Sequence, residues 1–110
     1  MATQFNHSSP SITAGTSRTL LYGPVGVGTT VVVFSGTFAN IDDASRGTHW
    51  ITLESVDSSG NYTEKLYQVP IPFGSSSMCP KMVLLPGESL YVTADQNDAV
   101  SCSVEVLILS

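Results

Sequence analysis

Apolar and polar residues alternate through most of the chain after Leu20, and Gly, Pro and Asx turn residues interrupt the alternation at short intervals. The segment 29–40 is the longest of these stretches and is apolar on both faces of its first half. Such a strand is expected to lie centrally and to be covered on both sides. The segment 100–109 has the same character near its end. No helical period occurs anywhere, so the pattern predicts strands alone.

Turn signals divide the remaining segments. Asp57-Ser58-Ser59-Gly60 predicts a hairpin between strands at 49–56 and 62–69, and Pro86-Gly87 predicts a compact hairpin between 81–85 and 89–94. Pro70-Ile71-Pro72 predicts an edge position, because proline offers no amide hydrogen. Gly36 predicts a bulge or bend within its strand. About seven to eight strands follow, and they indicate an all-β fold without significant helix, a two-sheet β-sandwich of jelly-roll or Greek-key type.

The first 17 residues form a separate region. They are rich in Ser and Thr and contain Phe5 and Ile12 as their larger apolar side chains. Such a segment does not bury enough apolar surface to fold alone. We therefore expect a flexible polar arm over residues 1–17, followed by the sandwich over 18–110. Ordering of the arm on a neighbouring subunit and a disordered terminus are both open.

Charge restricts the partners. Four basic residues stand against nine acidic ones, the formal net charge is −5, and the basic residues are scattered. No basic stripe exists to neutralise phosphates, so we expect neither nucleic acid nor a membrane as a partner. Ser and Thr make up about a quarter of the chain. Neutral hydroxyls are easier to desolvate than charges, which favours burial against another protein.

The start of the chain lacks the pattern of a signal peptide, and we expect synthesis and assembly in a cytoplasm. Cys79 and Cys102 are then expected to be free thiols, with a bridge between them as the open alternative.

Candidates for chemistry are few. His7 lies in the expected arm, and His49 stands at a strand start, where a structural role is the expectation. We expect no catalytic residues, no cofactor and no metal site. Calcium binding stays open at two acidic loops, which contain Asp42 and Asp43, and Asp95, Asn97 and Asp98.

Carboxylates and aromatic residues on the strands have ordinary explanations. Glu54, Glu64, Glu88 and Glu105 occupy positions typical of solvated faces. Sugar binding by Trp50, Tyr62 or Tyr67 is an alternative to their packing within the domain.

Several motifs occur in order along the chain. They are Leu20-Leu21-Tyr22-Gly23-Pro24, then Gly28-Thr29-Thr30-Val31-Val32-Val33, Asn40, Pro70-Ile71-Pro72-Phe73-Gly74-Ser75-Ser76 and Leu84-Leu85-Pro86-Gly87-Glu88-Ser89-Leu90-Tyr91-Val92. This order resembles small virion proteins of tailed bacteriophages, and it covers most of residues 20–109. The resemblance implies a β-sandwich accessory protein on a capsid or tail, located in the virion and without catalysis.

From this resemblance we expect a non-enzymatic capsid decoration protein that binds the major capsid protein and copies of itself. A tail, collar or fibre component is the alternative, and a small carbohydrate- or ligand-binding module is the alternative from another class. Phe5, Ile12, Arg18 and Trp50 are the residues expected to contact partners.

Overall fold

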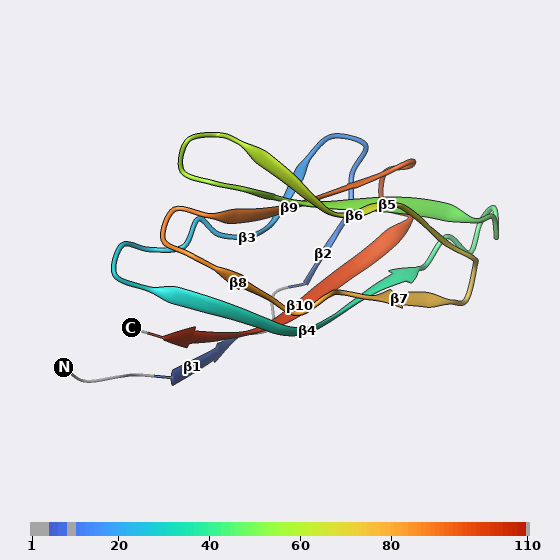
Figure 1. Ribbon diagram of the computed structural model, residues 1–110. Helices are drawn as coiled ribbons and strands as arrows, with labels where there is room; N and C mark the ends of the chain where they lie inside the picture. Colours follow the sequence, from blue (N-terminus) through green and yellow to red (C-terminus); the bar gives the residue numbers. More distant parts are fainter. Residues whose placement is uncertain (1–4, 9–10, 110) are drawn as a thin grey trace.

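The computed structural model in Figure 1 describes residues 5–8 and 11–109, and it describes side chains from residue 11 onward. The described residues form strands, turns and loops, and no helix among them is long and apolar enough to span a membrane. The strands are β1 (Phe5–Ser8), β2 (Ser11–Thr13), β3 (Thr19–Tyr22), β4 (Thr30–Asn40), β5 (His49–Val56), β6 (Tyr62–Ile71), β7 (Ser76–Met78), β8 (Met82–Leu84), β9 (Ser89–Ala94) and β10 (Val100–Leu109).

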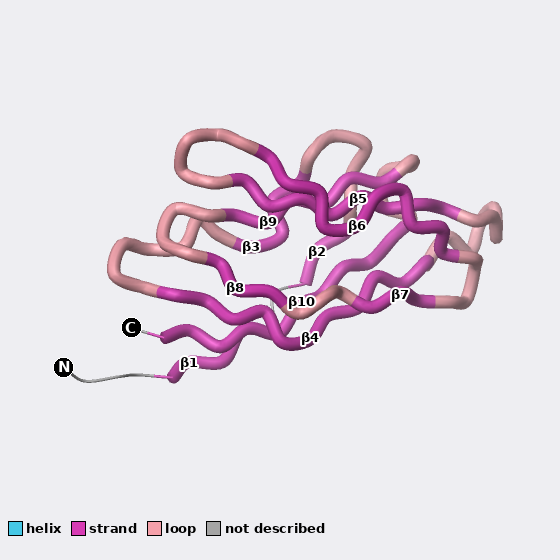
Figure 2. The backbone as a smooth tube through the Cα atoms, in the orientation of Figure 1, coloured by secondary structure: helices cyan, strands magenta, loops and turns pink. Residues whose placement is uncertain are grey.

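Two antiparallel sheets stack face to face. Sheet A has the order β1-β10-β4-β7, with β2 also on β10 and β8 also on β4, and sheet B has the order β3-β9-β5-β6. If β1 and β2 count as one interrupted strand, and β7 and β8 as another, the sandwich has eight described strands. Numbered in chain order, strand one then pairs with strand eight, two with seven, three with six and four with five. That nested pairing is the jelly roll, so the expected β-sandwich is confirmed. Figure 2 shows loops joining the strands at both ends of the two layers.

The core lies between the sheets and follows the alternation that the sequence predicted. In β4 the side chains of Val31, Val33 and Phe38 point inward and are almost fully buried, and Ile51 and Leu53 do the same from β5. Successive strand residues point to opposite faces, so the residues between them form the outer faces. The other nearly inaccessible large side chains are Ile71, Leu84, Leu90, Val92, Val100, Val104 and Val106.

Gly36 lies where two neighbours approach the β4 backbone. A Cβ atom at this position would lie 2.7 Å from the Cys79 Cβ and 2.8 Å from the Ser103 carbonyl oxygen. The expected bulge lies nearby. Glu105 of β10 pairs with Ser35 of β4 and Val106 pairs with Val33, so the register shifts at Phe34. Close approach from both sides, and not the bulge alone, therefore requires glycine here.

The expected hairpin at Pro86-Gly87 is half right. The turn is present: Gly87 has φ 86°, and the Glu88 amide donates to the Leu85 carbonyl at 3.0 Å. The strands on its two sides do not pair, because β8 joins β4 in sheet A and β9 joins β3 and β5 in sheet B. The turn therefore connects the two layers, and the hairpin prediction is wrong.

The structure has ten described strands where about seven to eight were expected. Part of the difference lies near the N-terminus, where β1 pairs with β10 from Phe5 opposite Leu109, and β2 pairs with the same strand from Ile12 opposite Cys102. Ala14 is fully buried. The short polar strands gain order from the long strand beside them. Ordering of residues 1–17 on a neighbouring subunit stays a prediction.

Candidate functional site

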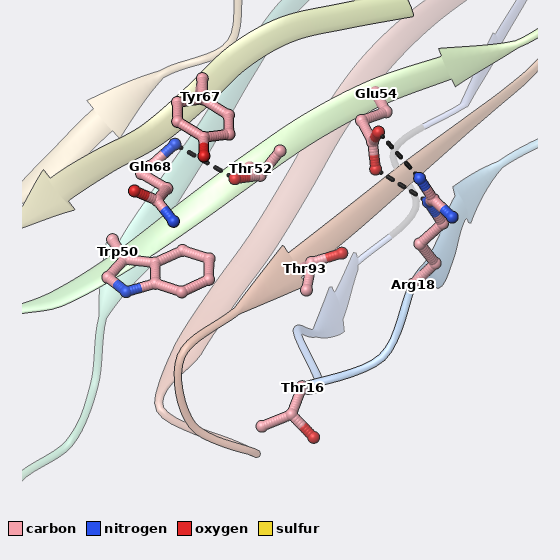
Figure 3. Close-up of a pocket in the computed structure, with 8 residues that line it drawn as sticks. All are labelled: Thr16, Arg18, Trp50, Thr52, Glu54, Tyr67, Gln68 and Thr93. Carbon is pink, nitrogen blue, oxygen red and sulfur yellow. Dashed lines mark hydrogen bonds and ion pairs between the residues drawn. The ribbon is translucent and has the colours of Figure 1, made fainter. Parts of the chain in front are cut away.

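A hollow of about 320 Å³ lies on the outer face of sheet B (Figure 3), and we call it the sheet-B hollow. Its floor comes from β5, where inward Ile51 and Leu53 alternate with outward Trp50, Thr52 and Glu54. Its walls come from β6, β9 and the segment before β3. The lining residues are Thr16, Arg18, Trp50, Thr52, Glu54, Tyr67, Gln68 and Thr93.

A β-bulge shapes the β6 wall of the hollow. Ile51 pairs with Val69 and Leu53 pairs with Leu66, so two β6 residues, Tyr67 and Gln68, stand opposite Thr52 alone. Gln68 has φ 45°, and its backbone amide donates to the Thr52 Oγ1 at 3.1 Å. In a regular strand, neighbouring side chains point to opposite faces. The bulge turns the chain so that both Tyr67 and Gln68 line the hollow.

An ion pair closes one side of the hollow. The Arg18 Nε donates to the Glu54 Oε1 at 2.9 Å and its Nη2 to Oε2 at 3.2 Å, which is a bidentate arrangement. The guanidinium carbon lies 3.7 Å from the centroid of the Tyr62 ring. The hydrogen bonds to Glu54 raise the pKa of Arg18 above its ordinary value. Glu54 is only 9% exposed, so its expected place on a solvated face is wrong.

A second polar cluster ties the loops at one end of the sandwich. Both nitrogens of the His49 ring face carboxylates: Nε2 lies 2.7 Å from the Asp42 Oδ2, and Nδ1 lies 3.0 Å from the Asp95 Oδ1. The hydrogen bond that His49 donates to Asp42 is the main cause that raises the pKa of His49, and Asp95 adds to it. Hydrogen bonds from Ser45 and then from His49 lower the pKa of Asp42 to about 2. His49 therefore holds the 41–47 loop against the end of β9.

This cluster bears on the calcium question. Asp42 and Asp95 come from the two acidic loops, and both carboxylates contact His49. Across residues 11–109 no group of three or more His, Cys, Asp or Glu side chains is arranged to hold a metal ion.

The two cysteines lie within the sandwich. Cys79 is 6% exposed and Cys102 is fully buried, and both are free thiols. Burial raises the pKa of Cys79 to about 11 and that of Cys102 to about 12. Thiols in this state are poor nucleophiles, because the reactive species is the thiolate.

The structure brings together two of the four residues expected to contact partners, Arg18 and Trp50, which line the same hollow. Ile12 is half-buried and packs against the core. Phe5 belongs to β1 of sheet A, and its side chain lies outside the described part. A contact of these residues with a partner stays a prediction.

Sequence reasoning missed Thr16, Thr52, Gln68 and Thr93. Thr52 could have been found, because it alternates with the apolar residues of its strand. The position of Gln68 depends on the bulge, and nothing in the residues 66–69 signals it.

Comparisons with known proteins point to the fold. No protein-family model matches the chain, and no curated protein matches it by sequence. Among solved structures the chain is similar to a protein of Bacillus endospore appendages, described as a novel family of disulfide-linked pili. The TM-score is 0.58 at 13% sequence identity, and the match covers 97% of this chain and 86% of that chain. This likeness shows a common fold.

Proposed function

We propose that the protein is a non-enzymatic structural protein that assembles with copies of itself through the outer face of sheet A. The observation that carries the proposal is an apolar row on that face. Val32 of β4 stands between Val83 of β8 and Leu107 of β10 in the register of the sheet, and Leu109 follows two residues along β10. Val83 is 56% exposed, and the other three are half-buried.

The apolar row corrects one expectation from the sequence. The first half of β4 was expected to be covered on both sides. Its inward side chains Val31 and Val33 are buried, whereas outward Val32 remains partly open in the single chain, next to exposed Val83. Contiguous apolar surface of this kind marks interaction sites. A second copy laid on this face would complete the coverage that the pattern predicts.

Charge favours a second copy at this face. Each chain carries a formal net charge of −5, so two copies repel each other least when they meet through faces with few charges. Within the described bounds of the sheet A strands, Glu105 is the one Asp, Glu, Lys or Arg residue. Burying the apolar row therefore requires little desolvation of charge. The fold likeness to a pilus protein supports self-association, because a pilus is a polymer of its subunits.

The finer roles expected from the sequence rest on the resemblance to phage virion proteins. Capsid decoration, a place in the tail, collar or fibre, and a location in the virion stay predictions, and the fold likeness does not add support to them. The self-assembling structural role is the part that the fold likeness and the apolar row both support.

Light scattering after size-exclusion chromatography tests the proposal. The wild-type chain should elute as an oligomer or polymer, and V83K should shift it towards the monomer, because a lysine within the buried row must be desolvated. V27K is the matched control, since Val27 is 99% exposed in a turn outside sheet A. A wild-type chain that stays monomeric at high concentration, or equal effects of the two variants, would contradict the proposal.

A further inference from the structure

The bulge at Gln68 places an unfavourable backbone conformation at the edge of a hollow. A non-glycine residue at φ 45° is strained, because its Cβ crowds the backbone, and such strain concentrates at functional sites. β6 is an edge strand that pairs only with β5, so the sheet itself does not need the bulge. Its structural consequence is that Tyr67 and Gln68 both line the sheet-B hollow. This combination suggests a ligand that contacts both side chains.

The lining combines flat apolar groups with donors and acceptors. The Trp50 indole is half-buried and the Tyr67 ring is 65% exposed, so both leave aromatic surface within reach of a ligand. Gln68 supplies a carboxamide with two donor hydrogens and an acceptor oxygen, and Thr93 adds a hydroxyl. Figure 3 shows these side chains arranged around the opening.

The Arg18–Glu54 pair completes the polar side. The two hydrogen bonds to Glu54 occupy two of the five guanidinium donors, and the Tyr62 ring supports the guanidinium from one face. The remaining donors are held in a fixed orientation, which lowers the entropy lost on binding. Because the two charges neutralise each other, the hollow carries no net charge from its lining residues.

These features match the chemistry of a sugar. A pyranose ring has a face of C–H groups that packs on an aromatic ring, and an edge of hydroxyls that each donate and accept hydrogen bonds. Amide, guanidinium, carboxylate and hydroxyl groups serve that edge. The volume of about 320 Å³ is near the lower end of the range for small-molecule sites, which fits one or two sugar rings. An acidic sugar would gain nothing from a neutral lining.

We propose that the sheet-B hollow binds the terminal one or two units of a neutral saccharide, with Trp50 and Tyr67 as the stacking surface and Gln68 and Arg18 as hydroxyl partners. The site is independent of the assembly proposed above, because sheet B forms the opposite layer of the sandwich. A subunit that assembles through sheet A would leave the sheet-B hollow open to solvent.

The test starts with the full chain on an array of neutral and acidic oligosaccharides. The methyl glycoside of the best-bound terminal sugar is then titrated into ¹⁵N-labelled protein, with amide shifts as the readout. We expect binding to neutral glycans and shifts at the bulge in β6. W50A should weaken binding by about tenfold or more, because the stacking surface is lost. F73A is the matched control, since Phe73 is a partly exposed aromatic outside the hollow.

The variant Q68G distinguishes a loss of glycan binding from a loss of folding. Glycine adopts positive φ readily, so this variant keeps the bulge and should unfold at an equal or higher temperature than the wild type. It removes the carboxamide and should still weaken glycan binding several-fold. Three results would overturn the proposal: no glycan binding up to millimolar concentration, binding that survives both W50A and Q68G, or W50A changing the oligomeric state in place of glycan binding. The last result would assign the hollow to a protein contact.

Discussion

Asn40 at the end of β4 links the two sheets through a buried side chain. Its Nδ2 donates to the carbonyls of Gly47 and Ile71, both at 2.8 Å, and its Oδ1 accepts from the Asp42 amide at 3.0 Å. Asn40 is 4% exposed, and Ile71 belongs to β6 of the other sheet. We predict that N40A is among the most destabilising polar substitutions in this chain.

The magnitude follows from the three hydrogen bonds. Each contributes about 1 kcal/mol net, and their removal leaves backbone groups with unmet hydrogen-bonding needs inside the protein. A loss of about 3–4 kcal/mol in the free energy of unfolding is therefore expected. For a domain of this size that corresponds to a fall of about 15 °C in the melting temperature.

Urea denaturation and thermal unfolding of purified variants measure this effect. N40D is a second variant, nearly isosteric with the wild type. It keeps an acceptor for the Asp42 amide but places an oxygen opposite the carbonyl oxygens of Gly47 and Ile71. It should be destabilised at least as much as N40A. N61A is the matched control: Asn61 lies in the exposed turn, where its Nδ2 reaches the Asp57 carboxylate at 3.4 Å. The control should lose less than about 0.5 kcal/mol. Equal losses in N40A and N61A would refute the reasoning.

Three further predictions follow. Because the folded state raises the pKa of His49 and lowers that of Asp42 to about 2, the stability from this pair should be complete between their ordinary pKa values of 6.5 and 3.8. It should be lost as pH rises through the raised value of His49, and as pH falls from 3.8 towards 2; urea denaturation at each pH measures it. G36A should lose about 1–3 kcal/mol, because its Cβ overlaps Cys79. Because Cys79 and Cys102 are buried, Ellman's reagent should react far more slowly with native than with unfolded protein. For the same reason, any assembly should persist in reductant.

Each of these has its own control. H49Q should remove the alkaline decline in stability, and a decline that persists unchanged would assign it to another group. G26A is the control for G36A, since the nearest atom to a Cβ at Gly26 is the Thr29 Oγ1 at 3.7 Å. Rapid thiol reaction in the native state, or dissociation by reductant, would contradict the buried positions of the cysteines.

Local patterns predicted the layers of the fold but not all of its pairings. Alternation identified the core of β4, β5 and β10, because burial imposes a period of two along a strand. The Pro86-Gly87 turn was predicted correctly, but a turn fixes only the local chain direction. Whether β8 and β9 then pair or separate depends on β4 and β5, which compete for them across long distances in sequence. No local signal carries that information.

The candidate site was predicted in part for the same reason. Trp50 and Arg18 were expected to contact partners, and the structure places both at the sheet-B hollow. Glu54 was assigned to a solvated face, because a carboxylate at an alternate position is usually exposed. Arg18, 36 positions earlier in the chain, covers it instead. The bulge that positions Gln68 arises from the pairing of β5 with β6, which the residues of β6 alone do not specify.

Thiol labelling of V83C in the assembled protein tests most directly whether copies meet at the apolar row of sheet A. The native Cys79 and Cys102 are buried, so an introduced thiol reports on its own position. The account predicts that V83C reacts slowly with maleimide in the assembly and quickly once the copies are diluted apart, whereas V27C reacts quickly in both states. Equal labelling of V83C in the two states would show that the copies meet elsewhere.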